Sequence, residues 1–219
     1  MRLGMICRAA GALVLGLSLA GCIDVTMDVK VKSETEAQGT MTQVISAQFY
    51  PMIKASATSD DASKAGDSFC KKEDGGVLVE NADGSATCTL TKSGKFADLA
   101  FDDGKEQVKF TSAGPGLVRV SFPTEEFQKG LDAAAKPGGA SDASDDAQTK
   151  AAAEQMKVAM GAYFAGHFLT IRIEGGEITD SNMTIAADKQ SAEDKIAFTD
   201  ILAGTAKLPP ELYAVVKVN

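Results

Sequence analysis

Ten residues near the N-terminus alternate strictly between apolar and polar side chains. The apolar positions are Ile23, Val25, Met27, Val29 and Val31, and acidic, hydroxyl or basic residues occupy the positions between them. Successive side chains of a strand point to opposite faces, so this period of two predicts a half-buried β-strand over 23–32. A turn over 33–39 and a second strand over 40–47 follow, which predicts an antiparallel pair.

Similar patterns continue along the chain. Turn-forming residues at 81–84 and 112–116 predict hairpins that join 77–80 to 86–91 and 107–111 to 117–122. Further strands are expected at 169–174, 177–186 and 212–218, and helices at 124–135, 148–161 and 192–202. We therefore expect an α+β fold, in which a few helices cover a mainly antiparallel sheet. The pattern predicts one domain over 22–219, with an exposed, mobile loop at 136–147 that is rich in Gly, Ser and Asp.

The N-terminus has the features of an export signal. Arg2 and Arg8 precede an apolar run over 9–21, which at 13 residues is short for a membrane-spanning helix of about 20 residues. The run ends in Leu19-Ala20-Gly21-Cys22, a lipobox pattern. We interpret 1–21 as a signal peptide and Cys22 as the lipidated first residue of the mature protein.

These residues resemble the lipobox of bacterial lipoproteins. The resemblance implies a diacylglyceryl thioether on Cys22 and often an acylated amine, and two or more acyl chains anchor a protein stably. It implies a location in the cell envelope, on a membrane and facing the periplasm or the exterior. Ile23, rather than aspartate, follows the cysteine, which by the same resemblance favours the outer membrane.

The layout also resembles the LppM-like bacterial lipoproteins. The resemblance rests on the alternating strand over 22–32, the Gly-led strand over 39–47 and the strand with a Gly-Gly turn over 171–176. It implies a domain of similar arrangement beginning at the lipidated cysteine. The resemblance brings no enzymatic activity and no site residues to this chain.

The cysteines are assigned to different roles. Cys7 leaves with the signal peptide and Cys22 takes the lipid, so Cys70 and Cys88 form the only pair of the mature domain. An oxidising envelope favours a disulfide, worth about 3 kcal/mol in the chain-entropy model. A redox pair is normally spaced Cys-x-x-Cys, and zinc would need two further ligands beside the single histidine, His167.

Composition excludes some partners. Without 1–21 the chain has 20 basic and 30 acidic residues, a net charge of −10, which argues against nucleic-acid binding and against docking on anionic headgroups by charge. The chain has no tryptophan, which weakens a carbohydrate-binding interpretation.

No motif specifies a reaction. Ser68-Phe69-Cys70-Lys71 matches Ser-x-x-Lys, but the Lys-Thr-Gly strand of the penicillin-binding serine enzymes is missing from the sequence. The acid-rich segment 98–106 lacks the spacing of a calcium loop. We predict no cofactor and no metal, and interpret His167 as a hydrogen-bonded structural residue.

One apolar stripe is a candidate ligand site. Met156, Met160 and Phe164 recur at helical spacing and either line a groove for an apolar ligand or belong to an ordinary core. We expect a non-catalytic binding or assembly module, not an enzyme, whose partner is an envelope protein or an apolar or lipid ligand. The alternative is a carboxylate-dependent hydrolase that acts on an envelope substrate.

Overall fold

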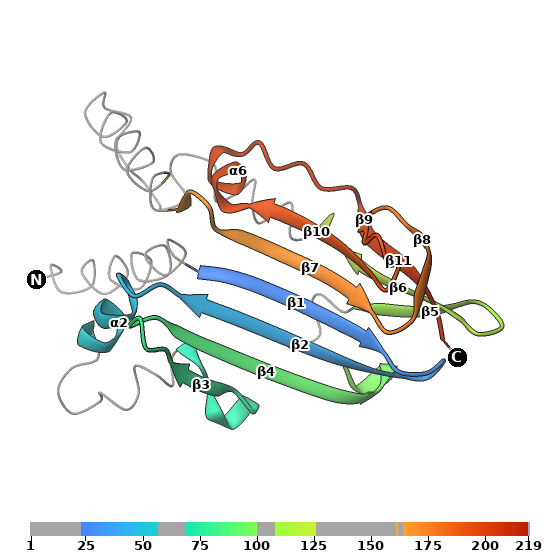
Figure 1. The fold of residues 1–219 in the computed structure, drawn as a ribbon, viewed down its shortest axis with the longest axis horizontal. Coiled ribbons are helices and arrows are strands. Elements are labelled where there is room, and N and C mark those ends of the chain that lie inside the picture. The colour runs from blue at the N-terminus through green and yellow to red at the C-terminus, as the bar shows by residue number, and fades with distance from the viewer. Residues whose placement is uncertain (1–22, 57–68, 100–107, 126–160, 162–163, 219) are drawn as a thin grey trace, which may run out of the picture.

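Two β-sheets pack face to face in the computed structural model, which describes residues 23–56, 69–99, 108–125, 161 and 164–218 (Figure 1). In spatial order, the larger sheet consists of β3 (Val77–Glu80), β4 (Ala86–Lys95), β2 (Glu36–Ile45), β1 (Ile23–Val31), β7 (Phe168–Glu174), β10 (Ser191–Ala197) and β9 (Thr184–Ile185). The smaller sheet consists of β5 (Lys109–Gly114), β6 (Leu117–Pro123), β11 (Glu211–Lys217) and β8 (Glu177–Ser181).

Strand β1 lies in the middle of the larger sheet, and its alternating pattern is confirmed as a strand. It pairs antiparallel with β2, where Met27 faces Met41, and parallel with β7, where Met27 faces Ile171. Met27 and Val29 therefore share one face with Met41 of β2 and with Ile171 and Ile173 of β7, although Val25 lies opposite Gln43. Thr26 and Asp28 lie on the other face, beside Thr170 and Arg172 of β7.

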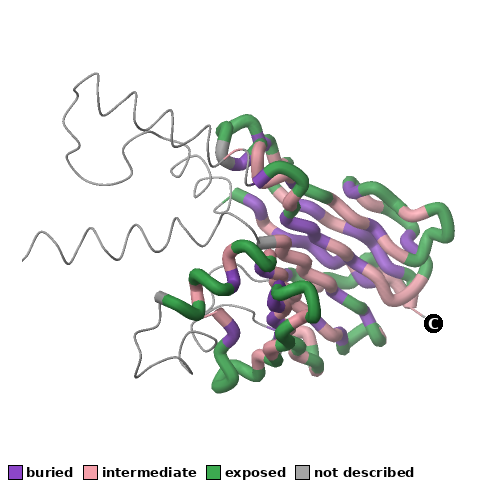
Figure 2. The backbone as a smooth tube through the Cα atoms, turned by 60° about the vertical axis from the view of Figure 1, so that its left-hand side comes forward, coloured by how far each residue is buried: buried purple, intermediate pink, exposed green. Residues whose placement is uncertain are grey.

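The main core lies between the sheets. The larger sheet contributes Val29, Val31, Ile171 and Ile173, and the smaller sheet contributes, among others, Val118, Val120, Leu212 and Val216. All of these side chains are buried, and Figure 2 shows the buried residues recurring along neighbouring strands. Each Å² of apolar surface that is removed from water stabilises a fold by about 25 cal/mol. The contact between the two sheets, which buries the largest apolar cluster, is therefore a major source of stability.

The expected α+β fold is wrong, because a second sheet, rather than a layer of helices, covers the apolar face. Within the described residues there are two α-helices, α2 (Tyr50–Ser56) and α6 (Phe198–Ala203), together with the 3₁₀ turns η2 (Lys72–Asp74) and η3 (Phe96–Asp98). Both α-helices lie at the end of the larger sheet where β1 begins (Figure 1). A period of two identifies a strand, but it does not assign the strand to one sheet or another.

The helix predicted over 192–202 is also wrong for most of its length. The segment forms strand β10 through Ala197, and only the short helix α6 follows. Ala192 and Ile196 are buried and four positions apart, and this spacing places two residues on one face in a strand as well as in a helix. Pairing with β7 decides the outcome.

Gly175 and Gly176 carry the chain from β7 in the larger sheet to β8 in the smaller one. Gly175 has a φ of +123°, and a Cβ atom there would overlap the backbone of Val31 at the end of β1. A Cβ atom on Gly176 would overlap the carbonyl oxygen of Lys217 at the end of β11. The junction between the sheets therefore requires two residues without side chains.

Several predictions fall outside the described residues. They concern the signal peptide over 1–21, the loop at 136–147 and nearly all of the helices at 124–135 and 148–161, and they remain predictions. Among the described helices, none has the length and apolar character needed to cross a bilayer.

Candidate functional site

Strand β3 forms one edge of the larger sheet, because among the described strands only β4 lies beside it (Figure 1). Val77 pairs with Thr89 and Val79 with Thr87. The side chains of Val77 and Val79 lie on the face turned away from the core and are 60% and 51% exposed. An edge strand presents free backbone N–H and C=O groups, and natural sheets usually protect such an edge with charges, proline or a bulge. Here its outward face carries two valines.

A hydrogen-bonded turn fixes β3 against β4. The amide of Asn81 donates to the carbonyl oxygen of Ser85 at 2.8 Å, and Gly84 adopts a φ of +86°. The carboxylate of Asp83 accepts hydrogen bonds from the hydroxyl and the amide of Ser85, at 2.6 and 2.9 Å. The hydroxyl bond lowers the pKa of Asp83, and the amide bond adds to this effect. The edge is therefore presented by a well-ordered hairpin.

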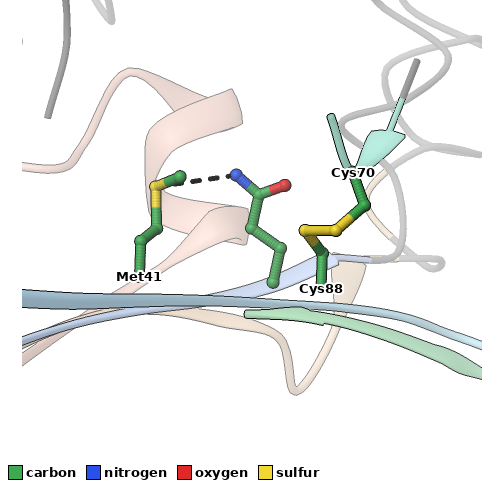
Figure 3. Close-up of a disulfide and its surroundings, with 4 residues drawn as sticks. Met41, Cys70 and Cys88 are labelled. Carbon is green, nitrogen blue, oxygen red and sulfur yellow. Dashed lines mark hydrogen bonds between the residues drawn. A yellow bond between two sulfur atoms is a disulfide. The ribbon is translucent and has the colours of Figure 1, made fainter. Parts of the chain in front are cut away.

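The predicted disulfide between Cys70 and Cys88 is confirmed. Its Cα atoms are 5.5 Å apart, and both cysteines are buried. Figure 3 shows the bridge on the same side of the sheet as Met41. A Cβ atom on Gly76 would lie 2.9 Å from the sulfur of Cys70, which explains the glycine that leads into β3. The bridge ties the segment before β3 to the strand that β3 pairs with.

A first open hollow of about 530 Å³ lies between α2 and the β3–β4 turn. The hydroxyl of Tyr50 and the ammonium of Lys54 both donate to one carboxylate oxygen of Glu80, each at 2.8 Å. Burial raises the pKa of Tyr50 to about 12, and the hydrogen bond to Glu80 contributes. The bond from Lys54, followed by that from Tyr50, lowers the pKa of Glu80. The polar groups of this hollow largely satisfy one another.

A second open hollow of about 570 Å³ lies beside β10 and β9 and includes Arg172 in its lining. The Arg172 guanidinium lies 3.3 Å from Glu174 and 4.0 Å from Asp28. Burial raises the pKa of Asp28, although the charge of Arg172 opposes that rise. Lys195 lies 3.0 Å from Glu193. Arg172, Glu193 and Lys195 are thus engaged in ion pairs, and most of the residues that line this hollow are polar or charged.

Asp24 joins the beginning of β1 to the beginning of β7. One carboxylate oxygen accepts a hydrogen bond from the amide of Phe168 at 2.8 Å, and the other lies 3.0 Å from Nδ1 of His167. His167 is half-buried, in agreement with its interpretation as a hydrogen-bonded structural residue. The ring of Phe168 is 37% exposed at this end of the sheet.

The remaining predicted site residues are only partly described. Cys22, Met156 and Met160 lie outside the described residues, so lipidation and ligand binding there remain predictions. Phe164 is only 1% exposed, and its ring centroid lies 5.9 Å from that of Phe198. This placement is typical of a core residue. Within the described residues, no three His, Cys, Asp or Glu side chains converge on a metal-sized site.

Sequence reasoning missed the edge valines and Phe168. The turn at 81–84 predicts a strand over 77–80, but a local turn carries no information on which strand ends a sheet. Phe168 directly precedes the alternating residues of β7. Its adjacency to Asp24 depends on parallel pairing of segments over 140 residues apart in the chain.

Comparison with known proteins gives little further identification. No family model matches the chain, and no curated protein matches it. A solved structure similar to this chain is the NMR structure of the folded domain of LppM from Mycobacterium tuberculosis. The likeness covers 90% of each chain at 10% identity and a TM-score of 0.45. LppM gives its name to the family that the sequence layout resembles, and a likeness at this level assigns neither fold nor function to this chain.

Proposed function

We propose that this chain is a non-catalytic module of the bacterial cell envelope that binds a protein partner along β3. Acylated Cys22 holds the module on a membrane, and the residue after Cys22 favours the outer membrane. The observation that carries the binding role is the open edge strand, with Val77 and Val79 exposed on its outward face.

Strand addition is the binding mode that fits this edge. An extended segment of a partner would pair with the free backbone groups of β3, and the two valines would offer apolar contacts to alternate side chains of that segment. The turn at 81–84 and the Cys70–Cys88 disulfide support the arrangement, because they hold β3 in place before a partner arrives. A strand ordered in advance loses less conformational freedom on binding.

An apolar or lipid ligand receives less support. Such a ligand needs a concave site lined mostly by apolar side chains. The two hollows are open to solvent, and their linings include Lys54 and Glu80 in one and Arg172 and Glu193 in the other. Phe164, a candidate for lining an apolar groove, is packed in the interior.

The hydrolase alternative is also less supported. It requires two carboxyl groups that face each other across a substrate cleft, at about 5–9.5 Å. The carboxylates of Asp28, Glu174 and Glu193 instead lie near the basic groups of Arg172 and Lys195. Asp28 is nevertheless a suitable probe, because burial raises its pKa. If the protein hydrolyses an envelope substrate and Asp28→Asn loses that activity, the hydrolase alternative would be favoured.

Site-specific photo-crosslinking in intact cells tests the binding role. A benzoylphenylalanine at position 77 on β3 should give one crosslinked product of defined mass, whereas the same group at Ser93, exposed on β4, should give none. Adding Val79→Lys should abolish the product from position 77, because a lysine on an edge opposes strand addition. Thr91→Lys, at an exposed position of β4, is the matched control and should leave the product unchanged.

The same experiment can refute the proposal. If position 77 and Ser93 give the same products, or if Val79→Lys leaves the product from position 77 intact, β3 is not the binding edge. Thermal unfolding of each variant establishes that the fold is retained. Surface substitutions of this kind normally change stability by less than about 0.5 kcal/mol.

A further inference from the structure

The end of the larger sheet where β1 begins carries exposed apolar side chains on both sides. Met52 of α2 is 62% exposed, while its neighbours Tyr50 and Ile53 pack in the apolar cluster around Ile45. Phe168 projects from the opposite face of the sheet, because it alternates with buried Leu169. The two side chains therefore flank the sheet at one end, which is the left-hand end in Figure 1.

Covalent geometry places the anchor of the proposed function at this same end. Ile23 is the first residue of β1, and Cys22 directly precedes it. Consecutive Cα atoms lie only about 3.8 Å apart, so no linker separates the acylated residue from the sheet. The Asp24 carboxylate accepts a hydrogen bond from Phe168, and Ile23 pairs with Ile45 just before α2. The start of β1 thus lies between the start of β7, which carries Phe168, and the end of β2, which leads to Met52 in α2.

We propose that Met52 and Phe168 contact the apolar boundary of the bilayer that holds Cys22, so that the larger sheet stands with this end on the membrane. The inference rests on the proposed function, since it requires the acyl anchor. Membrane interfaces favour apolar and aromatic side chains at the depth of the headgroup boundary.

The distribution of charge along the outward face agrees with this orientation. Asp24, next to the anchor, is engaged by His167 and by the amide of Phe168. The charged cluster of Lys30, Arg172 and Glu174 lies farther along the same face. Lys30 is six residues beyond Asp24, which at about 3.3 Å per residue places it about 20 Å from the anchor end. Along β1 and β7, charged side chains are thus more numerous away from the anchor, while the Lys54–Glu80 ion pair lies at the anchor end beside α2.

Fluorescence quenching tests this contact in the full acylated protein. The variants Met52→Cys, Phe168→Cys and Ser93→Cys are each labelled with bimane and reconstituted into vesicles of phosphatidylethanolamine and phosphatidylglycerol. Ser93 is exposed and pairs with Gln38, which pairs with Lys30, so it marks the distant end of the sheet. Lipids with a shallow doxyl group should quench the labels at 52 and 168 at least about twofold more than the label at 93.

Equal quenching at all three positions overturns the contact, and quenching at only one of positions 52 and 168 overturns the two-sided arrangement. Mass spectrometry of the N-terminal peptide separates this failure from a failure of the proposed function. If Cys22 is acylated and quenching is equal, only the contact is wrong. If Cys22 is unmodified, the anchor and the contact both fail.

Discussion

Removing the Cys70–Cys88 disulfide should destabilise the domain by an amount that follows from the length of the closed loop. The two cysteines are 18 positions apart. In the chain-entropy model a loop of this length stabilises the fold by about 3 kcal/mol. For a domain of this size, 1 kcal/mol shifts the melting temperature by about 2–4 °C, so the double variant Cys70→Ala/Cys88→Ala should melt about 6–12 °C lower.

Thermal unfolding followed by circular dichroism measures this shift. The wild-type protein melted in a reducing agent is the matched control, because it loses the same cross-link without a change of side chain. Hydrogen exchange should quicken most at β3, since the bridge fixes the segment that leads into that strand. A shift below about 2 °C in both the variant and the reduced protein would refute the reasoning. Unchanged exchange at β3 would refute the link between the bridge and the order of the edge strand.

Three further predictions test the fold and its charges. Gly175→Ala should destabilise the protein by more than about 4 kcal/mol in urea unfolding, because the added Cβ atom would overlap the backbone of Val31. Gly114→Ala is the control. Gly114 also has a positive φ, but its Cβ atom would make only an ordinary side-chain contact, so this substitution should cost about 1–2 kcal/mol. Tyr50 ionises near pH 10 in the unfolded chain and near 12 in the folded protein, so the wild type should lose on the order of 2–3 kcal/mol as pH rises through that window. Tyr50→Phe should lack this loss, and parallel unfolding curves at pH 9 and 11.5 would contradict the assignment. Burial raises the pKa of Asp28, so the wild type should gain stability relative to Asp28→Asn as pH falls through the folded-state pKa. At pH 7 the variant should be at least as stable as the wild type. A less stable variant at pH 7 would show that the ion pair between Asp28 and Arg172 outweighs the cost of burial.

Local patterns predicted most strands but not their assembly. The alternation of Ile23 through Val31 was sufficient to identify β1, and the turn at 81–84 was sufficient to identify the β3–β4 hairpin. The assignment of β7 and β8 to different sheets depends on Gly175 and Gly176 fitting against the ends of β1 and β11. No local period encodes that contact, which is why helices, rather than a second sheet, were expected to cover the core.

The candidate site divides in the same way. Counting cysteines predicted the disulfide, because only Cys70 and Cys88 remain once the signal peptide and the lipidated residue are set aside. The exposure of Val77 and Val79 depends on β3 being last in the sheet order, which long-range pairing determines. The contact between Asp24 and His167 likewise requires the parallel pairing of β1 and β7.

The mass of the N-terminal peptide of the mature protein tests the central claim most directly. The membrane role and the orientation of the sheet both require that the chain be cut before Cys22 and that its thiol carry a diacylglyceryl group. Purified from its own membrane and digested, the protein should yield a first peptide that begins at Cys22 with the mass of at least two acyl chains. A first peptide that begins elsewhere, or one with an unmodified cysteine, would contradict the account.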